Sequence, residues 1–242
     1  EAEVEAALTA LVETQRAAIL AAAPAGRFVR EPRPPRPGET VLDVVVAPDE
    51  PPFVGFHSHG PEHSQYPGGC SKIALPAQAP SRAYRKLEEA LAWSRLPLRR
   101  GQVAVEIGSA PGGASFALLS RGLKVVGVDP GEMAPQVLAD EGFRHVQCSL
   151  GELRREQLPA HVDWLLLDVN LAPQVVLHGV RRIVSTLRGT LRGVVFTLKL
   201  NDWKMADAVP QLLGRVGAMG LVDVRATQLP SNRREICEIG RA

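Results

Sequence analysis

Residues 103–129 read VAVEIGSAPGGASFALLSRGLKVVGVD. Two short, mostly apolar runs are separated by a Gly-rich turn and by a segment long enough for a helix. Continuously apolar runs of this length are typical of buried parallel strands, and a helix is the usual connection between such strands. The turn EIGSAPGG (106–113) therefore follows one predicted strand, and Asp129 ends the next.

The same alternation continues to the end of the chain. Further strands are predicted at 144–148, 162–168, 193–199, 222–228 and 234–240, with helices near 81–93, 133–141, 174–188 and 204–218. This order predicts an α/β fold with a mostly parallel central sheet that is covered by helices on both faces. Only residues 229–233 separate the last two strands, which is too short for a parallel crossover. We therefore expect a terminal antiparallel pair.

Upstream of this unit the sequence has a different texture. We expect a small N-terminal module over 1–78, with a helix at 3–23 and a β-hairpin made of 41–47 and 52–58, followed by the main domain over 79–242. A Pro-rich segment between helix and hairpin carries four arginines at intervals of three: Arg27, Arg30, Arg33 and Arg36. An anion-contacting face and a solvated linker are both compatible with that segment.

The composition excludes several classes of protein. With 45% hydrophobic and 22% charged residues, the chain can bury a core and is not intrinsically disordered. A formal net charge of +2 excludes a strongly polycationic protein. No apolar run approaches the roughly 20 residues of a membrane span, so we expect no contact with a membrane. Three widely spaced cysteines favour a reducing compartment, and we expect a cytoplasmic protein.

Lysine is scarce in this chain. Of 28 basic residues only five are lysines: Lys72, Lys86, Lys124, Lys199 and Lys204. Arginine does not release its proton in a protein, whereas a buried lysine can. Each remaining lysine is therefore a candidate for a site at which a proton must leave or arrive.

The turn after the first strand of the main unit predicts a bound nucleoside. Its glycines let the backbone approach a ligand closely, but their spacing is not that of dinucleotide enzymes, and Pro111 removes an amide donor useful to a pyrophosphate. Asp129, 21 residues after Gly108, can accept both hydroxyls of an adenosine ribose. These features favour S-adenosylmethionine over a dinucleotide, with a plain Gly-rich turn as the alternative.

Five ordered stretches resemble the FtsJ-like ribose 2'-O-methyltransferases, and most of all the bacterial 23S rRNA cytidine 2'-O-methyltransferase (RlmM) family. They are APSRAYRKLEEAL (79–91), EIGSAPGGASFALLSRGLKVVGVDPGEM (106–133), VDWLLLDV (162–169), VVFTLKL (194–200) and QLPSNRREI (228–236). The resemblance implies a class I Rossmann-like methyltransferase fold and a catalytic tetrad made of Lys86, Asp168, Lys199 and Glu235. The expected cofactor-binding residues are Gly108, Ala110, Pro111, Gly112, Gly113, Asp129, Ser149 and Asp168.

The predicted reaction is 2'-O-methylation of ribose in RNA, with ribosomal RNA as the expected substrate. Lys199 is the expected general base, and a second nearby lysine together with partial burial is expected to lower its pKa. Asp168 would orient Lys199 and the methyl donor, Lys86 would tune the base, and Glu235 would position Lys86 or the ribose. The alternatives are a methyltransferase acting on another RNA or a small molecule, and a non-catalytic RNA-binding or assembly protein.

Two further features bear on binding. Relatives carry an acid after the third strand to meet the adenine amine, where this chain has Ser149, with Gln147 or a backbone carbonyl as possible substitutes.

His57, His59, His63 and Cys70 gather in the loop upstream, but their spacing matches no common zinc finger. We therefore expect no metal, and interpret the histidines as solvated or RNA-contacting. No obligate protein partner is expected.

Overall fold

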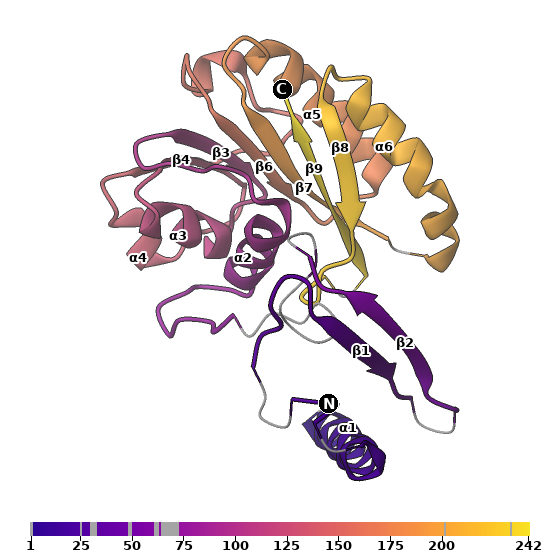
Figure 1. The fold of residues 1–242 in the computed structure, drawn as a ribbon. Coiled ribbons are helices and arrows are strands. Elements are labelled where there is room, and N and C mark those ends of the chain that lie inside the picture. Colours follow the sequence, from indigo (N-terminus) through magenta and orange to yellow (C-terminus); the bar gives the residue numbers. More distant parts are fainter. Residues whose placement is uncertain are drawn as a thin grey trace. The chain divides into compact units, whose positions relative to one another are not determined.

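The computed structural model describes residues 2–24, 26–29, 33–47, 50–60, 63, 73–200, 202–232 and 234–242. They belong to two compact units, Glu1–Ser71 and Lys72–Ala242 (Figure 1). The expected domain boundary after residue 78 stays a prediction.

The second unit is built on a seven-stranded sheet with the order β5-β4-β3-β6-β7-β9-β8 (Figure 1). Its strands are β3 (Val103–Ile107), β4 (Lys124–Val128), β5 (Phe143–Val146), β6 (Trp164–Asp168), β7 (Gly193–Lys199), β8 (Val222–Thr227) and β9 (Glu235–Arg241). Its helices are α2 (Ala83–Ser94), α3 (Gly113–Ser120), α4 (Pro135–Leu138), α5 (Pro173–Leu187) and α6 (Val209–Gly217), with short 3-10 turns at Arg155–Gln157 and Trp203–Ala208. The predicted α/β architecture is confirmed.

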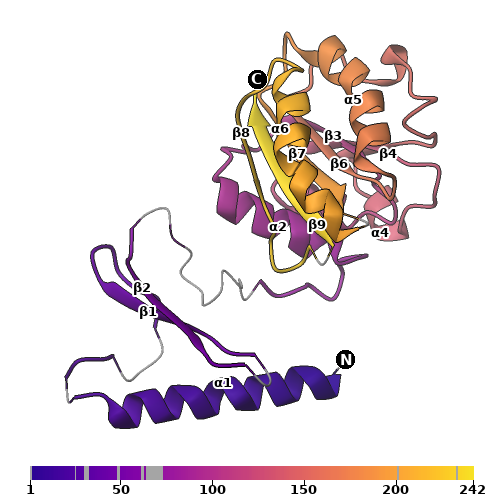
Figure 2. The ribbon, with the colours of Figure 1, turned by 90° about the vertical axis from the view of Figure 1, so that its right-hand side faces the viewer.

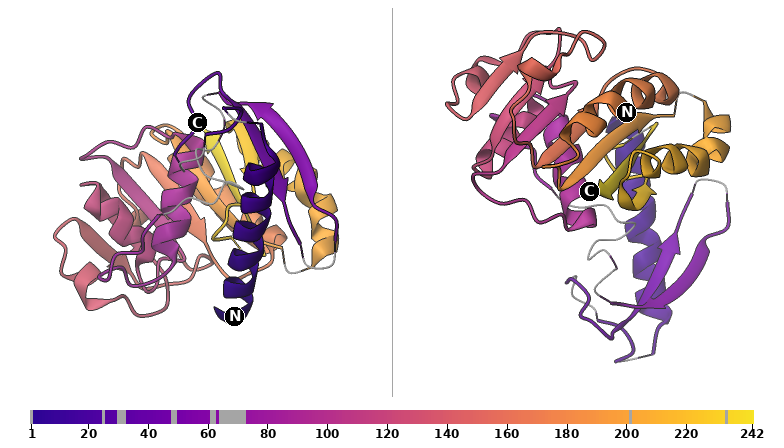
Figure 3. Two further views of the ribbon diagram at one scale, coloured as in Figure 1. Left: turned by 60° about the horizontal axis from the view of Figure 1, so that its bottom comes forward. Right: turned by 90° about the horizontal axis from the view of Figure 1, so that it is seen from above.

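Two hydrophobic cores lie on opposite faces of this sheet. Along β6, Leu165 and Leu167 belong to the core that α5 and α6 cover, while Trp164 and Leu166 belong to the core under α2 and α3. Side chains alternate between faces along a strand, so a strand buried on both sides is apolar at most positions. This explains the continuously apolar runs in the sequence. Figures 2 and 3 show the two groups of helices on either side of the sheet.

The last strand, β9, runs against its neighbours. It pairs antiparallel with both β7 and β8, and it lies between them. The expected antiparallel pairing of the last two strands is therefore confirmed, but the insertion of β9 beside β7 was not predicted. Its register sets Glu235, the first residue of β9, opposite Lys199, the last residue of β7.

The first unit consists of a long helix and a hairpin. Helix α1 spans Ala2–Ala22, and the antiparallel strands β1 (Thr40–Val45) and β2 (Phe53–Ser58) agree with the predicted elements to within two residues. Arg33 of the Pro-rich segment pairs with Glu39 just before β1. Among the described residues, no helix combines the length and the apolar character needed to cross a membrane.

Candidate active site

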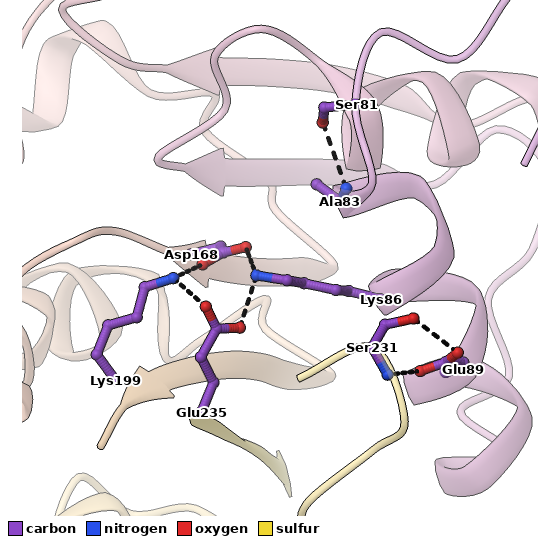
Figure 4. A network of polar contacts seen from close by, with 8 residues as sticks. All are labelled: Ser81, Ala83, Lys86, Glu89, Asp168, Lys199, Ser231 and Glu235. Atoms are coloured by element: carbon purple, nitrogen blue, oxygen red, sulfur yellow. Dashed lines mark hydrogen bonds and ion pairs between the residues drawn. The ribbon is translucent and has the colours of Figure 1, made fainter. Parts of the chain in front are cut away.

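Four charged side chains meet at one edge of the sheet in the second unit (Figure 4). Lys86 Nζ lies 3.2 Å from Asp168 Oδ2 and 2.6 Å from Glu235 Oε2. Lys199 Nζ lies 3.3 Å from Asp168 Oδ1 and also donates a hydrogen bond to Glu235 Oε1. Each carboxylate thus bridges both ammonium groups, and the four residues form a closed ring of alternating charge. The structure brings all four residues of the expected tetrad together.

The sheet positions three members of this charged ring. Asp168 and Lys199 end the neighbouring parallel strands β6 and β7, and the carboxyl ends of parallel strands are where open α/β sheets bind ligands. Glu235 reaches the same edge because β9 runs in the opposite direction and begins there. The antiparallel β9 therefore contributes its first residue to this edge, whereas β6 and β7 contribute their last residues.

Helix α2 supplies the fourth member, Lys86, from its first turns. The helix is joined to the loop before β9 by Glu89, which accepts hydrogen bonds from the backbone N–H of Ser231 at 2.9 Å and from its hydroxyl at 2.8 Å (Figure 4). Glu89 is buried, so these charge-assisted bonds are shielded from water. Lys86 and Glu235 are consequently held by elements that are themselves tied together.

The electrostatics of the charged ring differ from the expectation in one respect. Burial by itself would lower the pKa of Lys199, but the hydrogen bond to Glu235 and the negative charge of Asp168 outweigh it and raise the pKa above its ordinary value. Burial would likewise raise the pKa of Glu235, and its hydrogen bonds with Lys199 and Lys86 lower it on balance. The predicted lowering of the Lys199 pKa is wrong, because each lysine faces two carboxylates and only one other lysine.

A small pocket adjoins the ring, and its lining includes Lys86, Asp168, Glu106, Thr197 and Asn232. Asn232 is 1% exposed, and neither its amide nitrogen nor its amide oxygen has a hydrogen-bond partner among the described residues. A buried, unpaired amide at the wall of a pocket is available to a ligand. The sequence analysis missed this residue, although it lies inside the stretch QLPSNRREI.

Glu106 is a second residue that the sequence analysis did not single out. Burial raises its pKa to about 8, so this carboxyl group is protonated at neutral pH. It pairs with the hydroxyl of Ser115 at 2.5 Å, beneath the Gly-rich turn. A neutral Glu106 adds no net charge to the ring, whose two positive and two negative members remain balanced.

The Gly-rich turn packs directly against the end of β6. Gly108 has φ +84, and a Cβ built on it would lie 2.2 Å from the carbonyl oxygen of Asp168. On the other side of the turn, Asp129 accepts hydrogen bonds from the N–H groups of Ala110 at 3.1 Å and Gly131 at 2.7 Å. These amides aim the carboxylate and leave it further lone pairs for hydroxyl donors. The arrangement suits a nucleoside with a free ribose.

An acid is also present near Ser149. The backbone N–H and the hydroxyl of Ser149 both donate to Glu152, at 3.0 and 2.7 Å, and these bonds lower the pKa of Glu152. Gln147, the expected substitute, donates instead to the carbonyl of Pro130 at 3.3 Å. Glu152 is thus a further candidate for the adenine side of the site, which motif comparison at position 149 alone does not reveal.

A protein family and several named proteins are similar to this chain. The profile of the family described as FtsJ-like methyltransferase matches residues 79–200. A protein named ribosomal RNA large subunit methyltransferase M from Alkalilimnicola ehrlichii is 36% identical over 71% of this chain and 48% of its own length. Its namesake from Halorhodospira halophila is 35% identical over 77% of this chain and 54% of its own. The chain thus spans about half the length of these relatives.

Solved structures share the fold at low identity. A putative hemolysin from Lactococcus lactis has a TM-score of 0.54 and 18% identity, covering 69% of this chain and 89% of its own. A putative hemolysin from Streptococcus thermophilus has a TM-score of 0.53, also at 18% identity, covering 70% of this chain and 69% of its own. At this identity the likeness concerns the fold alone.

The close approach of Gly108 to Asp168 leads to a stability prediction. Gly108→Ala should lower the free energy of unfolding by roughly 2–4 kcal/mol, because it combines left-handed backbone strain with a clash against backbone atoms. The matched control is Gly101→Ala, since Gly101 has the same φ of +84 but no atom near the added Cβ. It should cost only about 1 kcal/mol. Equal losses for both variants in urea denaturation would contradict the proposed contact.

Proposed function

Because the chain belongs to the FtsJ-like methyltransferase family, we propose that it uses S-adenosylmethionine to methylate the ribose 2'-hydroxyl of RNA. Ribosomal RNA of the large subunit is the proposed substrate, since relatives at 35–36% identity carry that substrate in their names. Such a substrate would place the reaction in the cytoplasm. The observation that carries the proposal is the ring of Lys86, Asp168, Lys199 and Glu235 at the carboxyl ends of β6 and β7.

The residues around the Gly-rich turn suit the methyl donor. Asp129 would accept the ribose hydroxyls of the adenosine, and the backbone of Gly108, Ala110, Gly112 and Gly113 would line its path, with Pro111, Ser149 and Asp168 beside it. The amides of Ala110 and Gly131 already orient the Asp129 carboxylate for that role. When bound, S-adenosylmethionine would supply the electrophilic methyl group that the ribose 2'-oxygen accepts.

Lys199 is the proposed general base. In its neutral form Nζ would take the proton of the ribose 2'-hydroxyl and become an ammonium group, which Asp168 and Glu235 stabilise through the contacts they already make. Those same contacts raise its pKa, so the neutral form is a minor species at neutral pH but a strong base when present. Lys86 pairs with the second oxygen atom of each carboxylate and so keeps both carboxylates in place.

Methyl transfer is tested directly with the radiolabelled donor. The chain is incubated with tritiated S-adenosylmethionine and total bacterial RNA, and the RNA is digested to nucleosides. We expect label on a 2'-O-methyl nucleoside from large-subunit ribosomal RNA. Label on a base, on another RNA or on protein would overturn the proposed acceptor, and bound donor without transfer would favour a non-catalytic RNA-binding protein.

Lys199→Arg tests whether the site needs a base at this position or only a positive charge. Lys199→Arg keeps a cation between Asp168 and Glu235 but cannot accept a proton, so the rate of methyl transfer should fall by about 10²-fold or more while donor binding is retained. The matched control is Lys124→Arg, at the exposed start of β4, which should leave the rate unchanged. Single-turnover rates and equilibrium dialysis measure the two quantities. A fully active Lys199→Arg enzyme would contradict the assignment of Lys199 as the general base.

The raised pKa of Lys199 also sets the pH dependence. Because only neutral Lys199 acts, and its pKa lies above the ordinary lysine value, the rate should rise about tenfold per pH unit between roughly pH 6 and pH 9. Single-turnover measurements at saturating donor and RNA give this slope without interference from binding. A flat profile over this interval contradicts a lysine base.

A further inference from the structure

Three histidines come together in the first unit. His57 lies in β2, and His59 and His63 follow it. One ring nitrogen from each lies within 4.8 Å of the other two, and the rings of His57 and His63 are stacked with centroids 4.4 Å apart. Cys70, which the sequence places downstream, lies outside the described residues.

Among the described residues, one ring nitrogen of His57 has no hydrogen-bond partner. Its Nδ1 lies 2.6 Å from Asp43 Oδ2, and because an ionised carboxylate only accepts hydrogen bonds, this nitrogen carries the proton. Asp43 is a diagonal neighbour of His57 across the hairpin, since Val41 is the residue directly opposite. The other nitrogen, Nε2, is therefore left with a bare lone pair, and it is buried without a hydrogen-bond partner among the residues that the structure describes.

His59 is the most buried of the three, at 5% exposure, and its Nδ1 is also buried, with no hydrogen-bond partner in the described part of the chain. Its backbone is fixed on both sides. The N–H of His59 donates to Glu39 O and the N–H of Gly38 donates to His59 O, both at 2.7 Å. The ring is thus attached to a rigid continuation of the hairpin, two positions from His57 along the chain.

His63 closes the cluster from the loop side. The N–H of Gly60 donates to its Nδ1 at 3.0 Å, which orients the ring beside that of His57. One ring nitrogen of each histidine thus lies close to those of the other two, and His57 Nε2 and His59 Nδ1 have no hydrogen-bond partner among the described residues.

We propose that His57, His59 and His63 bind a divalent transition-metal ion of the zinc class. A buried nitrogen lone pair without a partner is costly, and a cation shared by the three rings removes that cost. Three imidazoles leave one position of a tetrahedral zinc ion open to water. Asp43 completes the arrangement, because metal-ligating histidines commonly donate their second N–H to a carboxylate that fixes the ring.

The test is metal titration of the whole chain, freed of metal by chelation and dialysis. All proteins carry Cys70→Ser, since a cysteine thiolate is also a strong ligand for these metals. We expect one equivalent of Co²⁺ to give a visible absorption band and one equivalent of Zn²⁺ to displace it. His57→Ala and His59→Ala should abolish the band, while His178→Ala, at an exposed position of α5, should preserve it.

A second variant keeps all three ligands and guards against a trivial loss of folding. Asp43→Asn should weaken Co²⁺ binding about 10- to 100-fold, because the amide no longer fixes the proton on His57 Nδ1. Circular dichroism checks that each variant retains the secondary structure of the parent. Absence of Co²⁺ binding by the parent, binding that survives both histidine variants, or unchanged affinity in Asp43→Asn would overturn the proposal.

Discussion

The antiparallel pairing of β9 with β7 is the constraint on which the charged site depends. A lysine at the end of a buried apolar strand is unfavourable unless an opposite charge meets it. The register of the two strands provides the opposite charge, because it sets Glu235 directly opposite Lys199. Glu235 then reaches Lys86 of α2 as well, so one strand pairing joins the sheet to the helix that covers it.

The balance of charge follows from that arrangement. Two carboxylates and two ammonium groups alternate, and every neighbour of a given group carries the opposite sign. Burial alone would favour the neutral forms, yet the pKa of Lys199 rises and that of Glu235 falls. The resting site is therefore a compact set of ion pairs. A lysine in such a site is a strong base, because its protonated form already has ion-pair partners. The same stabilisation makes its neutral, basic form a small fraction of the population.

Local pattern predicted the strands and most of the helices, because a strand buried on both faces and a helix between strands each leave a periodic trace. Two helices differ from the prediction: α4 covers only Pro135–Leu138 of the expected 133–141, and the helix expected over 204–218 begins with the 3-10 turn Trp203–Ala208. The four charged residues were expected from the resemblance to the FtsJ-like family, and the structure brings their side chains together. The position of β9 between β7 and β8 left no such trace, since strand order depends on pairing between distant segments. The pKa of Lys199 and the unpaired amide of Asn232 likewise arise only when separate segments meet. His57 and His59 did carry a signal, because residues two apart on an extended strand share one face.

The contact between Gly108 and the carbonyl of Asp168 has a consequence for how the site can change over time. The turn suited to the methyl donor and the strand end that carries an acid of the charged ring touch through their backbones, with no room for a side chain. Neither part can therefore move without displacing the other. A side chain at Gly108 would therefore disturb the donor-side turn and the charged ring together, so this junction accepts almost no substitution.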